Sequence, residues 1–168
     1  MKKFIKTVAL LSVTAAIHTN ATAAISVDDT NETSFEISGT ILPECKVNNT
    51  TVSGATSLNL ASTEAQNVAS VEIWCNTGQS TANTTYESLN GGVLKNDTHT
   101  GEDIAYLLDI SDTQTGVDLS TAQTITQGAG SDTEGLSIAR TVSIRPQVTG
   151  FEYEGSYSDT ISITVSYE

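Results

Sequence analysis

The sequence is poor in basic residues. It has seven lysines and arginines against twenty aspartates and glutamates, which gives a formal net charge of −13 over 168 residues. Three of the seven, Lys2, Lys3 and Lys6, lie at the N-terminus, and without them the balance is 4 − 20 = −16. A surface with this charge repels nucleic acid and anionic lipid, so neither is expected as a partner.

Long apolar runs are also scarce, with one exception at residues 8–17. This run follows the three lysines and precedes an A-x-A sequence at residues 21–23, an arrangement typical of a secretory signal peptide. We expect residues 1–23 to be removed, although cleavage after Ala24 is an alternative. No later segment approaches the roughly 18 apolar residues of a membrane span. The remaining 168 − 23 = 145 residues predict one exported, soluble domain.

Only two cysteines are present, Cys45 and Cys75. An even pair in an exported protein predicts one disulfide. A metal site is the rival interpretation, but no C-x-x-C occurs and His99 is the only histidine after the signal peptide.

Helical patterning is missing as well. Thr, Ser, Asn and Gly are abundant, and short segments that alternate at period 2 are separated by turn-rich stretches. This pattern predicts an all-β sandwich or barrel of about seven strands, with an immunoglobulin-like size. The expected strands cover residues 34–42, 68–75, a short segment around Tyr86, 104–110, part of 117–127, 136–148 and 156–167.

The last expected strand alternates strictly. Ile161, Ile163, Val165 and Tyr167 share one face, and small hydroxyl residues share the other. Only Glu168 follows Tyr167, so we expect no further strand of this sequence beside it. A long apolar edge with unpaired backbone groups invites strand addition by another chain.

Two stretches of sequence suggest a family. One is I-S-G-T-I-L-P-E-C at residues 37–45, with the second cysteine thirty residues later. The other is the ending G-S-Y-S-D-T-I-S-I-T-V-S-Y at residues 155–167, which is the more specific of the two. Together they resemble the bacterial chaperone–usher pilins, and most closely the archaic branch related to spore coat protein U. The middle of the chain carries no motif of this family.

The resemblance implies an incomplete immunoglobulin-like sandwich that lacks its C-terminal strand and is completed by a donor strand from another chain. It implies a donor-strand extension at residues 24–33 and a pilin domain at residues 34–168. A periplasmic chaperone would first lend a strand, and at the outer-membrane usher the extension of the next subunit would replace it. The expected function is therefore that of a structural subunit of a surface fimbria, for adhesion and biofilm formation, with no enzymatic activity, cofactor or metal.

The resemblance also implies roles for particular residues. Ile161, Ile163, Val165 and Tyr167 would line one side of the groove and form the strand that the chaperone recognises. Phe35, Ile37 and Ile41 would form the opposite wall, Ile25 and Val27 would be the donor side chains, and Cys45 and Cys75 the structural bridge. The extension departs from the family pattern because Asp28, Asp29 and Glu32 stand where a longer apolar alternation is expected.

Some residues of the sequence are also compatible with other functions. Asp109, Asp112 and Asp118 could form a paired-carboxylate active site, but nothing in the sequence marks two of them as buried or paired. Residues 27–32 and 131–134 offer oxygen ligands for calcium without the spacing of a known calcium loop. Trp74 could pack in the core or against a neighbouring subunit, or contact a sugar. A self-contained secreted sandwich that binds carbohydrate or calcium is thus the alternative function.

Overall fold

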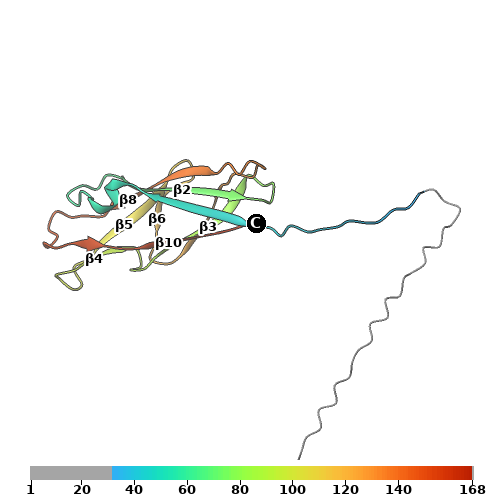
Figure 1. Cartoon of the computed structure of the whole chain (residues 1–168). Coiled ribbons are helices and arrows are strands. Elements are labelled where there is room, and N and C mark those ends of the chain that lie inside the picture. The colour runs from blue at the N-terminus through green and yellow to red at the C-terminus, as the bar shows by residue number, and fades with distance from the viewer. Residues whose placement is uncertain (1–31, 168) are drawn as a thin grey trace, which may run out of the picture. The chain divides into compact units, whose positions relative to one another are not determined.

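The computed structural model describes residues 32–167, so the expected signal peptide and the donor residues Ile25 and Val27 lie outside it (Figure 1). The described residues form a nearly all-β structure with two antiparallel sheets, as the sequence predicts. No helix in this part of the chain is long and apolar enough to cross a membrane. The elements are β1 (Cys45–Thr51), the short 3₁₀ helix η1 (Ser53–Thr56), β2 (Gln66–Cys75), β3 (Thr81–Ser88), β4 (Val93–Asn96), β5 (Ile104–Ile110), β6 (Gln114–Asp118), β7 (Gln123–Gly128), β8 (Ile138–Pro146), β9 (Tyr157–Ser158) and β10 (Ile161–Ser166).

The two sheets differ in size. The larger has the order β1-β2-β8-β5-β4-β9, with β6 beside β5, and the smaller has the order β10-β3-β7. The expected strands at 68–75, 104–110 and 136–148 correspond to β2, β5 and β8, and the bounds of β5 agree residue for residue. These three strands lie next to one another within the larger sheet.

The core lies between the two sheets and follows the predicted alternation. Val71, Ile73 and Cys75 of β2 are buried on one face, while Trp74 lies on the other and donates its indole N–H to the carbonyl of Asp132 (3.0 Å). The largest fully buried side chains come from both sheets: Tyr86, Ile73, Leu108, Ile110, Leu119 and Val71.

The strand predicted at residues 34–42 is wrong. These residues belong to no strand, and the first strand, β1, begins only at Cys45, after Pro43. The alternation of Phe35, Ile37 and Ile41 is real, but among residues 32–167 no strand pairs with this segment. An apolar alternation shows that a segment suits a sheet, and it does not guarantee that its own chain supplies the partner strand.

Two strands, β1 and β3, are rich in polar residues, so the sequence pattern indicates them weakly or not at all. β1 has the sequence C-K-V-N-N-T-T and little apolar character, yet it pairs with β2 along its whole length, with Cys45 directly opposite Cys75. The predicted disulfide joins these two residues. β3 is longer than the short strand expected around Tyr86. The sequence pattern understates its length because the polar residues Thr84 and Ser88 occupy two of its inward positions. Residues 117–127 contain the end of β6 and most of β7 rather than one weak strand.

One inward hydroxyl of β3 gives a stability prediction. Thr84 is fully buried, and its Oγ1 has no hydrogen-bond partner among the described residues. Thr84→Val keeps the shape of the side chain and removes the unsatisfied group, so we expect the free energy of unfolding to rise by about 1 kcal/mol. Urea unfolding measures the change. The matched control is Thr85→Val, because the Thr85 hydroxyl bonds that of Thr124 at 2.8 Å; an equal gain in both variants would contradict this explanation.

Candidate functional site

Two strand edges are open on the same side of the sandwich. Among residues 32–167, β1 pairs only with β2, and β10 pairs only with β3. β1 and β10 belong to different sheets, yet they lie near each other (Figure 1). The backbone N–H and C=O groups on their facing edges therefore have no strand partner in the described part of the chain.

An apolar groove of about 710 Å³ lies between these two strands. Ile161 and Ile163 of β10 line one side, and Asn49 and Thr51 of β1 line the other. The rest of the lining comes from core strands and from the connection after β1, and includes Leu58, Leu60, Val68, Ala69, Tyr86, Leu94, Tyr106, Val142 and Ile144. The groove thus gives access to the hydrophobic core from the side where the two sheets are not joined.

The inward face of β1 shows that this side of the core is uncovered. Val47 pairs with Ile73 and Asn49 with Val71, so each pair points to the same face of the sheet. Ile73 and Val71 are buried, whereas Val47 is 37% exposed and Asn49 is exposed as well. The smaller sheet covers the inner face of β2 but leaves that of β1 open to solvent.

The residues expected to line the groove from β10 lie as follows. Ile161 and Ile163 line the groove, and Val165 is half-buried against the core. Tyr167 follows the end of β10 and is 50% exposed.

The residues expected in the opposite wall are exposed to solvent. Phe35, Ile37 and Ile41 are 83%, 83% and 89% exposed, and they are not among the residues that line the groove. The wall is formed instead by β1 and the segment after it, which the sequence could not indicate because β1 is polar. Phe35, Ile37 and Ile41 belong to residues 34–42, which expose these apolar side chains and form no strand.

Asn76 holds residues 42–44, directly before β1. Its side chain accepts a hydrogen bond from the Glu44 amide (2.8 Å) and donates one to the Leu42 carbonyl (2.9 Å). Its amide donates to the Glu44 carbonyl (3.0 Å). Residues 42–44 are therefore tied to Asn76, which directly follows the end of β2.

At the other side of the groove, the chain passes from one sheet to the other at Asp159. Residues 157–158 pair with β4 of the larger sheet, and residues 161–166 pair with β3 of the smaller one. Asp159 Oδ2 accepts hydrogen bonds from Ser88 Oγ (2.5 Å) and Tyr106 OH (2.6 Å), and Oδ1 accepts one from the Asn90 amide (3.1 Å). Burial and the neighbouring Asp159 carboxylate raise the pKa of Tyr106, so its hydroxyl remains a donor at neutral pH.

Residues 154–156, just before this crossing, are held by Asn96 and Asp97 at the end of β4. Gly155 has φ +144°, and a Cβ there would collide with the side-chain amide of Asn96. Asn96 donates to the Glu154 carbonyl (3.2 Å), and the Ser156 amide donates to Asp97 Oδ1 (2.9 Å). The ending G-S-Y-S-D-T thus contains the glycine and the aspartate that this crossing uses.

Asp97 gives a pH prediction. The hydrogen bond from the Ser156 amide, followed by that from the Thr98 hydroxyl, lowers the pKa of Asp97 below its ordinary value of 3.8. The contribution of this carboxylate to stability is therefore complete above the unfolded pKa and is lost as the pH falls through the folded one. We expect a carboxyl ¹³C titration of Asp97 to show a midpoint below 3.8 in the folded chain and near the ordinary value in urea. Equal midpoints in the two states would contradict the Ser156 contact.

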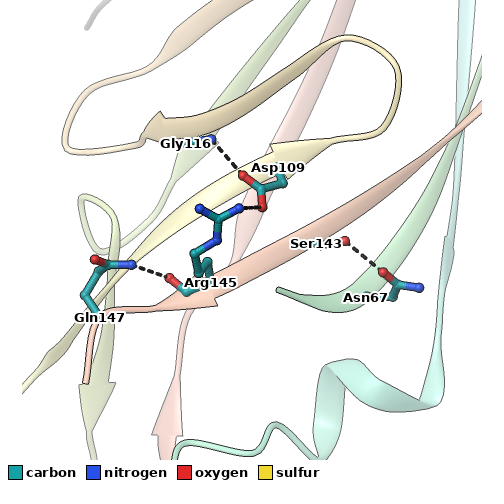
Figure 2. Close-up of polar contacts among 6 residues, drawn as sticks. All are labelled: Asn67, Asp109, Gly116, Ser143, Arg145 and Gln147. Atoms are coloured by element: carbon teal, nitrogen blue, oxygen red, sulfur yellow. Dashed lines mark hydrogen bonds and ion pairs between the residues drawn. The ribbon is translucent and has the colours of Figure 1, made fainter. Parts of the chain in front are cut away.

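The carboxylates considered for catalysis have structural partners. Asp109 forms an ion pair with Arg145 (2.5 Å) and accepts a hydrogen bond from the Gly116 amide (2.7 Å), as Figure 2 shows. Asp118 accepts from the Ser120 amide (2.8 Å), and Asp112 has a positive φ of 55° in the turn after β5. Asp109 and Asp118 therefore each hold a nearby backbone amide.

The calcium and sugar candidates are placed as follows. Asp132 Oδ1 accepts hydrogen bonds from the Glu134 and Leu136 amides, so this carboxylate organises its own loop. The ring of Trp74 has the Lys46 ammonium 5.6 Å from its centre. Within residues 32–167, no group of three or more His, Cys, Asp and Glu side chains could hold a metal ion.

No protein-family model matches the chain, and no curated protein matches it in sequence. The groove between β1 and β10 and the exposed apolar row at residues 35–41 are therefore the features from which a function can be inferred.

Proposed function

We propose that this chain is the structural subunit of a bacterial surface fimbria, and that it assembles when a strand from one copy enters the groove of another. One observation carries the proposal: an apolar groove is flanked by two strands, β1 and β10, whose facing edges have no partner in the described part of the chain. The sheet would be completed by the inserted strand.

A strand suits this groove better than a small apolar ligand does. A small ligand could fill the space above Tyr86 and Ile163, but it would leave the backbone groups of both edges without strand partners. An inserted strand forms backbone hydrogen bonds with an edge, while every second side chain points into the groove. Affinity then comes from the backbone and selectivity from the alternating side chains.

The segment best suited to the groove is residues 35–41 of a second copy. Phe35, Ile37 and Ile41 alternate on one face, with Gly39 between them, and all three apolar side chains are almost fully exposed. Seven residues span about 23 Å when extended, and β1, which has seven residues, forms one border of the groove. This places the inserted side chains later in the sequence than Ile25 and Val27, at the longer apolar alternation.

The contacts of Asn76 favour insertion into another copy. Leu42 and Glu44 bond Asn76, so laying residues 35–41 of the same chain along the open edge of β1 would need a turn at residues 42–44 and would break these hydrogen bonds. Insertion into a second copy leaves them intact. Such a contact joins two different surfaces and does not close on itself, so it produces a filament.

Export and assembly partners follow from the same proposal. A sequence typical of a signal peptide precedes the extension, and an open groove of this kind needs a temporary cover before assembly. The resemblance to chaperone–usher pilins supports a periplasmic chaperone and an outer-membrane usher in those roles. Adhesion and biofilm formation are the corresponding functions at the cell surface.

The test uses the mature chain and a synthetic peptide of residues 33–44. If the peptide fills the groove, a concentration of one hundred times Kd raises the free energy of unfolding by about 2.7 kcal/mol, which thermal melting detects. The matched control peptide carries Ile37→Asp. No stabilisation by the first peptide, or equal stabilisation by both, would overturn the proposal; stabilisation by a saccharide or by calcium instead would favour the alternative function.

A further inference from the structure

We propose that Asp159 is the positioning residue of the groove, and that it fixes the alignment at which an incoming strand pairs with β10. The inference rests on the proposed function, because it concerns how the same groove receives its strand. It assigns a role to an aspartate that lies at the border of the groove and contacts residues far away in the sequence.

The carboxylate of Asp159 joins three separate elements. Ser88 ends β3, Asn90 lies in the turn after it, and Tyr106 belongs to β5 of the other sheet. Each donates a hydrogen bond to Asp159. Hydrogen bonds to a charged acceptor are stronger than those between neutral groups, so this group of contacts is well suited to hold one point of the chain in place.

Ser88 holds the cluster of Ser88, Asn90, Tyr106 and Asp159 together because its hydroxyl both donates and accepts hydrogen bonds. Ser88 Oγ donates to Asp159 and accepts hydrogen bonds from the amides of Asn90 (3.2 Å) and Gly92 (2.7 Å). Asn90 Nδ2 donates to the Ser158 carbonyl (3.1 Å). The turn from β3 to β4 and the crossing from β9 to β10 are therefore bound to each other side by side.

This arrangement matters because, within residues 32–167, β10 has a partner strand on one side only. Ile161 pairs with Ser88, so the register of β10 on β3 begins directly beside the cluster. Small polar residues face outward on β10, and its inward residues are only half-buried, so side-chain packing alone constrains a two-residue shift weakly. Any such shift would move Ile161 and Ile163 along the groove and misalign an inserted strand.

Tyr106 links the alignment to the groove itself. Its ring lines the groove and is almost fully buried, while its hydroxyl donates to Asp159. Tyr106→Phe keeps the ring and removes only the donor. Asp159→Asn keeps the shape and removes the charge. The two variants thus weaken the same contact from opposite sides with little change in volume.

The test compares these variants with the control Ser162→Ala, which changes an exposed residue of β10. Circular dichroism first confirms that each mature chain is folded. Hydrogen exchange of the β10 amides is then measured, and a peptide of residues 33–44 with a nitroxide label reports by NMR which β10 amides lie near it. We expect exchange about tenfold faster in both variants, and a label that broadens one set of amides in wild type and in the control but a displaced or wider set in the variants.

The outcomes separate the two proposals. If the peptide binds wild type and both variants in one unchanged register, the positioning role is overturned and the proposed function stands. If the peptide does not bind wild type, the proposed function fails and the positioning role falls with it. Altered register in Asp159→Asn alone, with Tyr106→Phe unchanged, would also contradict the role of the shared contact.

Discussion

Replacing Ile37 by aspartate is expected to abolish assembly of the mature chain and to leave the stability of the single subunit unchanged. Ile37 is almost fully exposed in the isolated chain, so the new carboxylate stays in water. In the groove of another copy the same carboxylate would be buried among apolar side chains without a partner. Such burial costs at least about 3 kcal/mol, which corresponds to more than a hundredfold loss of affinity.

Light scattering after size-exclusion chromatography measures the result, with Glu36→Ala as the matched control. Glu36 is the neighbour of Ile37 and points to the opposite face of an extended segment, so its replacement should leave assembly intact. Ile37→Asp keeps an unaltered groove and can still accept a strand from wild type. Added to wild-type chains, it should therefore shorten the assemblies in proportion to its share. Filaments formed by Ile37→Asp alone would contradict the insertion of residues 35–41.

The central strands could be predicted from the sequence because their own residues are apolar at the positions that become buried. β2, β5 and β8 have apolar residues at inward positions, and the bounds of β5 match the apolar run at residues 104–110. The disulfide followed from the number of cysteines and an exported context. These features depend on the residues of each segment alone, without knowledge of its partner.

The borders of the groove could not be predicted in the same way. β1 is a strand because β2 and the Cys45–Cys75 bond hold it, although its own residues are mostly polar. Residues 34–42 have the stronger strand pattern and form none. Periodicity detects a segment that suits a sheet, but pairing depends on which edge is available. β1 lines the groove while Phe35, Ile37 and Ile41 are exposed, and the sequence pattern alone does not distinguish these two neighbouring segments.

The role of residues 155–160 could likewise be predicted only in part. The sequence G-S-Y-S-D-T is unusual, and it was the most specific part of the resemblance. Its physical meaning depends on Ser88 and Tyr106, which are 71 and 53 residues from Asp159. Neither residue carries a local signal of this contact, since Ser88 ends a polar strand and Tyr106 lies in an apolar one. The crossing between the sheets therefore depends on contacts between residues far apart in the sequence.

Removing the disulfide is the second change with a large expected effect. The bond between Cys45 and Cys75 spans 30 residues of sequence, and in the chain-entropy model its loss costs about 3 to 4 kcal/mol. Domains of this size are stable by about 5 to 15 kcal/mol. The double variant Cys45→Ala, Cys75→Ala should therefore unfold at a clearly lower urea concentration.

The region that loses protection from hydrogen exchange should show that this disulfide acts mainly on β1. β1 pairs only with β2 among the described residues, and most of its side chains are exposed, so little besides the bond and the backbone pairing retains it. Hydrogen exchange should consequently rise most in β1, while β5 and β8 stay protected as long as the domain is folded. Because β1 forms one side of the groove, the variant should also bind the peptide of residues 33–44 more weakly. A variant with unchanged peptide affinity and uniform loss of protection would show that β1 contributes nothing specific to the groove.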